Sequence, residues 1–283
     1  MAYRNEGKII LTSKKLTDIS LLPIVKKECR PLYFKYRNFE YVETSRGCPV
    51  KCPYCVESRL FSRVRFKPAT NVLEEMQFHH GHKKKRITFV DSNFSLSENH
   101  VKNICELIKK EDIDFKTIFV QMHVDYTTLE MLKTMKNKGF YLSFGIESLS
   151  EDVLRNINKT SNPANYIKKC IRLLKFCKKL NLPVQSNYIV PLPGIKVYKI
   201  IKEIKLLQKI STVALSFLTP YPGTPLWEKY KDEIKNFDLN TFDCEHVILR
   251  NGMKDEVLRY IIRSSYSKWH LKNLIKVFKL FVP

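Results

Sequence analysis

Three cysteines close to one another constrain the fold of this chain more than any other feature. They lie in the segment Arg46-Gly47-Cys48-Pro49-Val50-Lys51-Cys52-Pro53-Tyr54-Cys55, separated first by three residues and then by two. These spacings would line up the thiols on one face of a helix, but two prolines remove backbone donors and break such a helix. The segment is therefore predicted to be a loop that brings three thiolates to one point. Three soft ligands of this kind suit iron and sulfur.

A cubane 4Fe-4S cluster has four irons and is normally held by four thiolates, so three cysteines would leave one iron free for another ligand. The pattern Cys-x-x-x-Cys-x-x-Cys, with Tyr54 before the third cysteine, resembles the radical S-adenosylmethionine (SAM) enzymes. The resemblance implies that Cys48, Cys52 and Cys55 hold the cluster and that Tyr54 lies beside SAM. It also implies that SAM binds the free iron through its amino and carboxylate groups. One electron then cleaves SAM into methionine and a 5′-deoxyadenosyl radical.

Two other uses of the cysteines fit the sequence less well. A structural zinc site needs four ligands, usually in paired knuckles, and the nearby His79, His80 and His82 lie on an expected helix without matching spacing. A disulfide framework needs an oxidising compartment, and the first residues contain no apolar signal-peptide core. The other five cysteines are scattered, and we expect them to be ordinary thiols.

The composition indicates a globular protein with a strong excess of positive charge. The chain has 283 residues, 44% of them hydrophobic, which fits one α/β barrel or two small domains, and one domain is the better prediction. No apolar run approaches the roughly 20 residues needed to cross a bilayer, and we expect a cytoplasmic protein. Lys and Arg total 50 against 28 Asp and Glu, a net charge of +22. Such a charge attracts polyanions, either nucleic acid or an anionic membrane surface.

Strand and helix patterns alternate after the cysteine loop. The expected strands are residues 41–45, 86–90, 117–122, 141–146, 184–190 and 213–218, and the expected helices are residues 71–82, 97–110, 127–138, 151–157, 163–180 and 197–209. Six βα units with short connections predict an α/β fold with a parallel sheet curled into an open barrel; a doubly wound sheet is the alternative. Because radical SAM enzymes share a partial (β/α)6 TIM-type barrel, the resemblance favours the barrel.

The barrel is expected to occupy residues 38–227. Residues 1–37 are a polar, basic lead-in or linker, and residues 228–283 are expected to form a C-terminal helical extension. In that extension Leu271, Leu274, Ile275 and Phe278 recur at helical spacing. We expect this stripe to pack against the barrel, or otherwise to lie on a membrane surface or a partner.

Polar residues at the ends of two expected strands resemble the SAM-binding segments of the family. Asp91, Ser92 and Asn93 follow one strand, and the resemblance implies that they receive the amino group of SAM. Glu147 and Ser148 end another strand, where the resemblance implies a contact with SAM through the ribose hydroxyls. A carboxylate in such a place can hold a diol or an ammonium group. Glu147 and Ser148 could instead only cap the next helix.

Segments 188–194 and 220–227 extend the resemblance to a subgroup whose members usually carry an N-terminal cobalamin-binding domain, with methylthiotransferases as near relatives. The chain departs from that pattern at Asp91 to Asn93, at His123, where arginine is common, and at Ile195-Lys196, where an acidic residue is usual. About 40 residues precede the barrel, whereas a domain needs on the order of 100. Cobalamin is therefore expected to be absent from this chain, although 18–23 resembles the linker to such a domain.

The sequence as a whole predicts a radical SAM enzyme that abstracts hydrogen from an unknown substrate and needs a one-electron reductant such as ferredoxin or flavodoxin. No catalytic side chain is assigned. One alternative is a methyltransferase or methylthiotransferase-like enzyme whose cobalamin domain is supplied by another chain. The non-enzymatic alternatives are a basic protein that binds RNA or a membrane, and a zinc-binding nucleic-acid module.

Overall fold

The computed structural model describes residues 2–11, 17–24, 38–61, 63–192, 195–235 and 237–250. Six strands form one parallel sheet in which spatial order follows chain order: β3 (Phe39–Val42), β6 (Arg86–Phe89), β7 (Thr117–Met122), β8 (Phe140–Glu147), β9 (Val184–Val190) and β10 (Thr212–Phe217). Within the described part β3 and β10 are the two edge strands and do not pair with each other, so the barrel is open. The predicted α/β fold with six parallel strands is confirmed.

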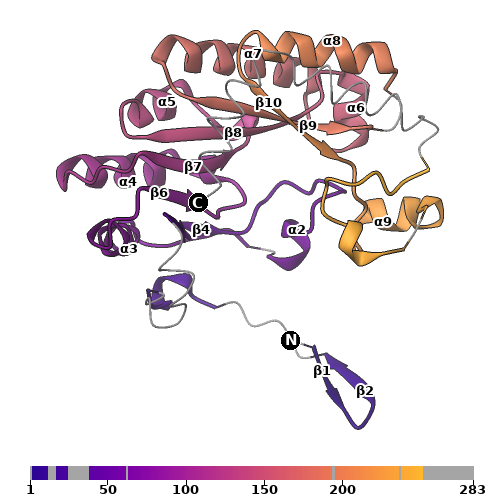
Figure 1. Ribbon diagram of the computed structural model, residues 1–283, viewed down its shortest axis with the longest axis horizontal. Helices are drawn as coiled ribbons and strands as arrows, with labels where there is room; N and C mark the ends of the chain where they lie inside the picture. The colour runs from indigo at the N-terminus through magenta and orange to yellow at the C-terminus, as the bar shows by residue number, and fades with distance from the viewer. Residues whose placement is uncertain are drawn as a thin grey trace.

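Helices form an arc around the outside of this sheet (Figure 1). They are α3 (Ala69–Gly81), α4 (Glu98–Lys110), α5 (Leu129–Met135), α6 (Glu151–Asn156), α7 (Pro163–Leu180) and α8 (Val197–Gln208). Ser97 caps α4 as expected, because its side chain accepts a hydrogen bond from the His100 amide. The helix expected to reach Lys138 already ends at Met135, and Gly139, at φ 74°, follows a short turn.

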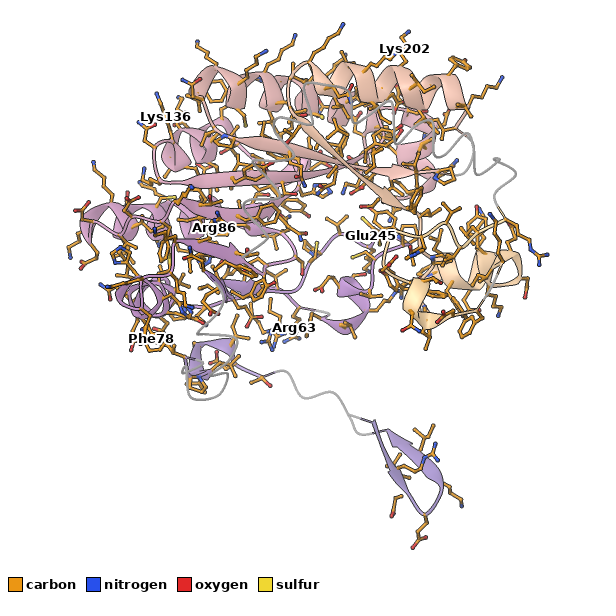
Figure 2. All side chains as sticks on the ribbon, viewed as in Figure 1. Arg63, Phe78, Arg86, Lys136, Lys202 and Glu245 are labelled. Carbon is orange, nitrogen blue, oxygen red and sulfur yellow. The ribbon has the colours of Figure 1, made fainter. Side chains whose placement is uncertain are left out.

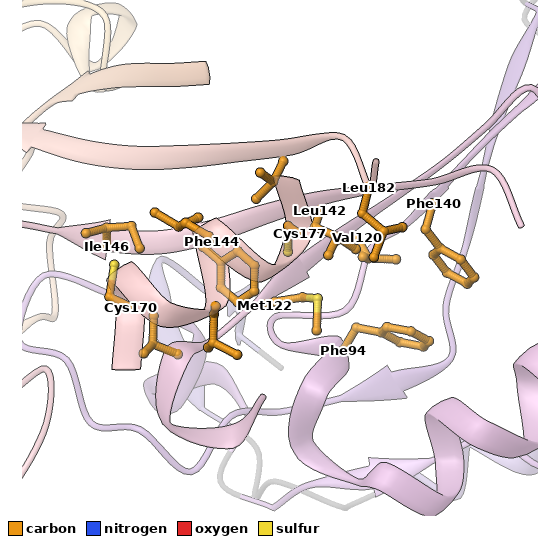
Figure 3. Close-up of a cluster of buried hydrophobic side chains, with 14 of the residues drawn as sticks. Phe94, Val120, Met122, Phe140, Leu142, Phe144, Ile146, Cys170, Cys177 and Leu182 are labelled. Carbon is orange, nitrogen blue, oxygen red and sulfur yellow. The ribbon is translucent and has the colours of Figure 1, made fainter. Parts of the chain in front are cut away.

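The core lies between the sheet and the helices, and β8 shows how the sequence builds it. Alternate residues Phe140, Leu142, Phe144 and Ile146 are buried against the helical layer, as the two-residue period of a strand requires (Figure 3). The residues between them are small or polar and face the concave side of the sheet. Burying one face this thoroughly fixes the register of the strand. That register determines which side chains reach the barrel mouth.

The N-terminal lead-in contains structure that its polar composition did not predict. Residues Ala2–Asn5 (β1) and Lys8–Leu11 (β2) pair as an antiparallel hairpin. A 3₁₀ turn, η1 (Ile19–Leu21), buries Ile19 completely, and the Asn71 side chain of α3 donates to the Ser20 carbonyl. The segment that resembles a linker is thus attached to the barrel.

The structure describes the expected C-terminal extension only as far as residue 250, where turns replace the expected helices; its helices beyond that point stay a prediction. Between α9 (Pro225–Tyr230) and residue 250, the described residues form the 3₁₀ turns η5 (Lys231–Glu233) and η6 (Leu239–Thr241) and a bridge between Ile234 and Leu249. Asp238 and Asp243 accept hydrogen bonds from backbone amides two or three residues ahead, which favours local turns over a helix. The apolar stripe from Leu271 to Phe278 lies outside the described residues. In the part of the chain that is described, no helix has both the length and the apolar composition for crossing a membrane.

Candidate active site

A cavity of about 180 Å³ lies where the strands end at the barrel mouth. Its walls come from the cysteine loop, from the residues just after β6 and β7, from the concave faces of β8 and β9, and from the α6–α7 connection. Its lining includes Cys48, Cys52, Tyr54, Cys55, Ser92, Asn93, Gln121, His123, Ser143, Gly145, Glu147, Lys159 and Asn187. Parallel strands bring their carboxyl ends to one edge, which is why segments distant in sequence meet here.

The cysteine loop follows the short strand β4 (Ser45–Arg46), which pairs antiparallel with β5 (Arg65–Phe66). The expected single strand over 41–45 is therefore split between β3 and β4. Gly47, at φ 99°, makes the sharp turn into the loop and lies against the Arg63 backbone so closely that a Cβ atom would not fit. Farther along, the Pro53 carbonyl accepts a hydrogen bond of 3.0 Å from the Leu226 amide of α9.

All three loop thiols are free and line the cavity. Burial is the largest cause that raises the pKa of each thiol. The neighbouring thiolates raise the pKa of Cys48 and Cys55 further, whereas the Lys159 ammonium group lowers the pKa of all three thiols. Three thiolates crowded together thus need a positively charged partner to be stable.

The donor set fits a cluster better than a single ion. Within the described ranges, no three His, Cys, Asp or Glu side chains are arranged to hold one bare metal ion. Three soft thiol ligands around a cavity that could take a group of several atoms suit an iron–sulfur cluster.

Glu147 and Lys159 form a buried ion pair that lines the same cavity. The Lys159 ammonium lies 3.0 Å from Glu147 Oε1, and the side chains are 6% and 9% exposed. Burial acts to lower the pKa of Lys159, but Glu147 and Cys52 raise it above its ordinary value. A Cβ atom at Gly145 would be 2.8 Å from Glu147 Oε1 and 3.0 Å from Lys159 Nζ. The glycine therefore leaves the space that the ion pair occupies.

The backbone at Glu147 is unusual, and a residue of α8 fixes the turn that follows. Glu147 has φ 65°, and the register between β8 and β9 shifts between Gly145 and Glu147. Glu203 Oε2 accepts three hydrogen bonds, from Ser148 Oγ at 2.9 Å, the Leu149 amide at 2.6 Å and Tyr188 Oη at 2.8 Å. Left-handed backbone at a residue with a side chain persists only where its surroundings hold it. Ser148 thus belongs to this support, and the cavity does not include it.

The segment after β6 divides into a supporting and a lining part. Asp91 is 1% exposed, and its carboxylate accepts from the Thr44 amide and hydroxyl and from the Ser45 hydroxyl. It ties the entry of the cysteine loop to the sheet and does not line the cavity, whereas the sequence predicted a SAM contact. Ser92 and Asn93 do line it, and the Ser92 hydroxyl donates to Glu57 Oε2 at 2.6 Å.

Asn93 and His123 bring unsatisfied polar atoms to the cavity. Asn93 Oδ1 accepts from the Ser95 and His123 amides, and its Nδ2 is buried without a hydrogen-bond partner among the described residues. His123 Nδ1 accepts from the Asp125 amide. His123 Nε2 makes no hydrogen bond of ordinary geometry within this part of the chain, although the Lys159 backbone is close enough to raise its pKa slightly. Burial dominates and lowers the pKa of His123 to about 3, so the ring is neutral.

The structure therefore brings together the three cysteines, Tyr54, Ser92, Asn93 and Glu147, as the sequence predicted, and leaves out Asp91 and Ser148. Sequence reasoning missed Lys159, which follows α6 by three residues in the unremarkable string Asn156-Ile157-Asn158-Lys159. It also missed the polar side chains of Gln121, Ser143 and Asn187 on the concave face. Only their position at alternate places in strands could have indicated them.

Comparisons with known proteins agree with this geometry. The model of the Radical SAM superfamily matches residues 42–207. An uncharacterized methyltransferase from Pyrococcus horikoshii is 28% identical over 99% of this chain and 63% of its own length. The bacteriochlorophyllide d C-12(1)-methyltransferase of Chlorobaculum tepidum is 27% identical over 75% of this chain and 47% of its own. The chain thus spans less than two thirds of the length of these curated relatives.

A solved structure shows the same fold. The radical SAM methyltransferase TsrM from Kitasatospora setae superposes with a TM-score of 0.61 at 19% identity, over 69% of this chain and 39% of that one. Enzymes of the matched superfamily use a 4Fe-4S cluster and SAM, which agrees with the donor set of the cavity. Because the family model covers more than half of the residues and includes the cysteine loop, this chain belongs to the Radical SAM superfamily.

Proposed function

We propose that the chain binds a 4Fe-4S cluster through Cys48, Cys52 and Cys55 and cleaves SAM reductively to act on a substrate by hydrogen abstraction. The proposal rests on one observation: three free thiols and a buried pair of opposite charges line the same cavity. When bound, the cluster supplies the electron that splits SAM into methionine and a 5′-deoxyadenosyl radical. The electron would come from a small one-electron carrier such as ferredoxin or flavodoxin.

The ion pair matches the charges of SAM. Besides its sulfonium, SAM carries a carboxylate, an ammonium and a ribose diol. Lys159 can donate to the carboxylate, and Glu147 can accept from the ammonium group or the ribose hydroxyls. Because Glu147 and Lys159 already neutralise each other without ligand, the carboxylate and the ammonium of SAM can bind by exchanging partners with this ion pair.

The neutral donors around the ion pair would orient the bound molecule. Asn93 lines the cavity, and its Nδ2 has no hydrogen-bond partner among the described residues, so it can donate to a ligand oxygen. Tyr54 stays a neutral phenol, because burial, Glu147 and Cys52 raise its pKa well above the ordinary value. The buried walls would keep water away from a reactive radical.

Methyl transfer is the second candidate, because the curated relatives reported above are named methyltransferases. Cobalamin for such a reaction would come from outside the residues described, on another chain or domain. The outcome can be read from the product of SAM without knowing the acceptor. Methyl donation leaves S-adenosylhomocysteine, whereas reductive cleavage leaves 5′-deoxyadenosine.

The test is anaerobic reconstitution with iron and sulfide, followed by dithionite and SAM. We expect about four irons per chain and formation of 5′-deoxyadenosine. Cys52→Ala should lose both. Cys105→Ala, a fully buried thiol of α4 outside the cavity, is the matched control and should keep both. Full iron content and SAM cleavage in Cys52→Ala would refute the proposal.

A further inference from the structure

The outward faces of α7 and α8 carry a concentration of positive charge that the proposed function does not use. The 18 residues of α7 include no Asp or Glu. Four exposed basic residues follow each other at intervals of four, three and four, which places them in one line along the helix: Lys168, Arg172, Lys175 and Lys179. This line lies opposite the buried side of α7, which includes Tyr166, Cys170 and Cys177.

The neighbouring helix α8 repeats the arrangement. Lys199, Lys202 and Lys205 are exposed at three-residue spacing, and Lys202 extends away from the molecule in Figure 2. The single acid of α8, Glu203, is turned inward and occupied by its three hydrogen bonds. Lys178 Nζ donates to the Lys209 carbonyl at 3.2 Å, which joins the ends of the two helices. The seven outward residues on α7 and α8 are called the basic face below.

The basic face differs from the other helical surfaces of the barrel. On α4, Lys102 lies 3.8 Å from Glu106, and Lys110 lies 3.9 Å from Glu111, so charges of both signs alternate. No residue of the basic face forms a salt bridge within the described part of the chain. A positive electrostatic potential therefore extends over the outward faces of two adjacent helices, α7 and α8.

We propose that the basic face docks the protein on an anionic phospholipid surface. Six of its seven residues are lysines, and a lysine is a point charge that needs no fixed partner geometry, which suits a fluid layer of headgroups; nucleic-acid recognition favours the arginine fork. Two apolar side chains stand exposed among the lysines of α8, Tyr198 at 62% and Leu206 at 45%. Such side chains gain by entering the interface between headgroups and acyl chains, whereas a leucine gains nothing on a phosphate backbone.

The surface is independent of the barrel mouth. Helices form the outer ring of this architecture, and none of the residues that line the cavity belongs to α7 or α8, so a membrane on these two helices would not cover the lining residues. Binding would hold the enzyme near the membrane without covering its site.

The experiment is sedimentation of the full chain with vesicles of phosphatidylcholine alone or with phosphatidylserine added. We expect binding only to the anionic vesicles. Lys199→Gln/Lys202→Gln/Lys205→Gln should weaken it at least tenfold, whereas Lys102→Gln/Lys109→Gln/Lys110→Gln on α4, with the same loss of charge, should weaken it less than twofold. Tyr198→Ser/Leu206→Ser, which leaves the charge unchanged, should also weaken it. Circular dichroism and iron content should be those of the unmutated protein in all variants.

Three results would overturn the proposal. Equal losses in the two triple variants would mean that net charge alone attracts the vesicles. Unchanged binding in Tyr198→Ser/Leu206→Ser would remove the argument for a lipid interface. Tighter binding of poly(U) RNA than of anionic vesicles at the same salt concentration, lost in the α8 triple variant, would assign the face to RNA.

Discussion

Replacing Gly47 by alanine should separate cluster loading from folding. Gly47 has φ 99°, a conformation that costs an L-residue about 1–2 kcal/mol. A Cβ atom there would also lie 2.9 Å from the Arg63 carbonyl carbon, inside the 3.0 Å limit that real Cβ atoms respect, and nearer still to the carbonyl oxygen. Because both neighbours are backbone, β4 and β5 must move apart, and such overpacking costs about 1–3 kcal/mol.

The two effects together amount to at least about 2 kcal/mol, which lowers the population of the native loop about thirtyfold or more. The six strands of the sheet do not include Gly47, so the fold should remain. The assay is iron per chain after anaerobic reconstitution, with circular dichroism as the check on folding. Gly223→Ala is the matched control, because Gly223 has φ 83° and nothing within 4 Å of the added Cβ. Equal iron content in the two variants would refute the reasoning.

Three further predictions concern the ion pair and a buried histidine. Glu147→Gln should weaken SAM binding about tenfold, the loss of one charge-assisted contact, while iron content stays the same; unchanged affinity in equilibrium dialysis would contradict this. Lys159→Met should lower the thermal midpoint more than Lys159→Met/Glu147→Gln, since the single change leaves a carboxylate buried alone; calorimetry decides the order. Burial lowers the pKa of His100 to about 4, so the folded state binds fewer protons than the unfolded state, and stability should fall by up to about 3 kcal/mol as the pH drops from 6.5 to 4. His100→Asn should flatten that slope in urea unfolding, and an unchanged slope would rule out His100 as its source.

The sequence predicted the strands and the cysteine loop well, because both depend on local patterns. The alternation of apolar residues within the expected strand 141–146 is enough to place Leu142, Phe144 and Ile146 on one face, and Pro49 and Pro53 exclude a helix wherever the loop lies. The same reasoning was less successful in separating the polar residues at the strand ends that line the cavity from those that only support it. Whether such a side chain faces a cavity depends on which hydrogen-bond partners lie within its range in the folded protein.

Asp91, Ser148 and Lys159 show this dependence. Asp91 is turned to the Thr44 and Ser45 hydroxyls, which lie 47 and 46 residues away, and Ser148 is turned to Glu203, 55 residues away. Lys159 can pair with Glu147 only because Gly145, which has no side chain, leaves room for the ammonium group. Partnerships over such separations are set by the packing of helices on the sheet, so no short segment of sequence contains them.

The hydrogen bond from the Leu226 amide to the Pro53 carbonyl bears on how short a functional fragment of this protein can be. The strands alone suggest a fragment that ends with β10. β3 and β10 do not pair in the described part, so the sheet stays open between them, and α9, which follows β10, is hydrogen-bonded to the cysteine loop, which follows β4. A fragment that stopped after β10 would keep every strand of the sheet and all three thiols. It would still lose this hydrogen bond to the loop, so we expect the smallest fragment that loads a cluster to extend through α9.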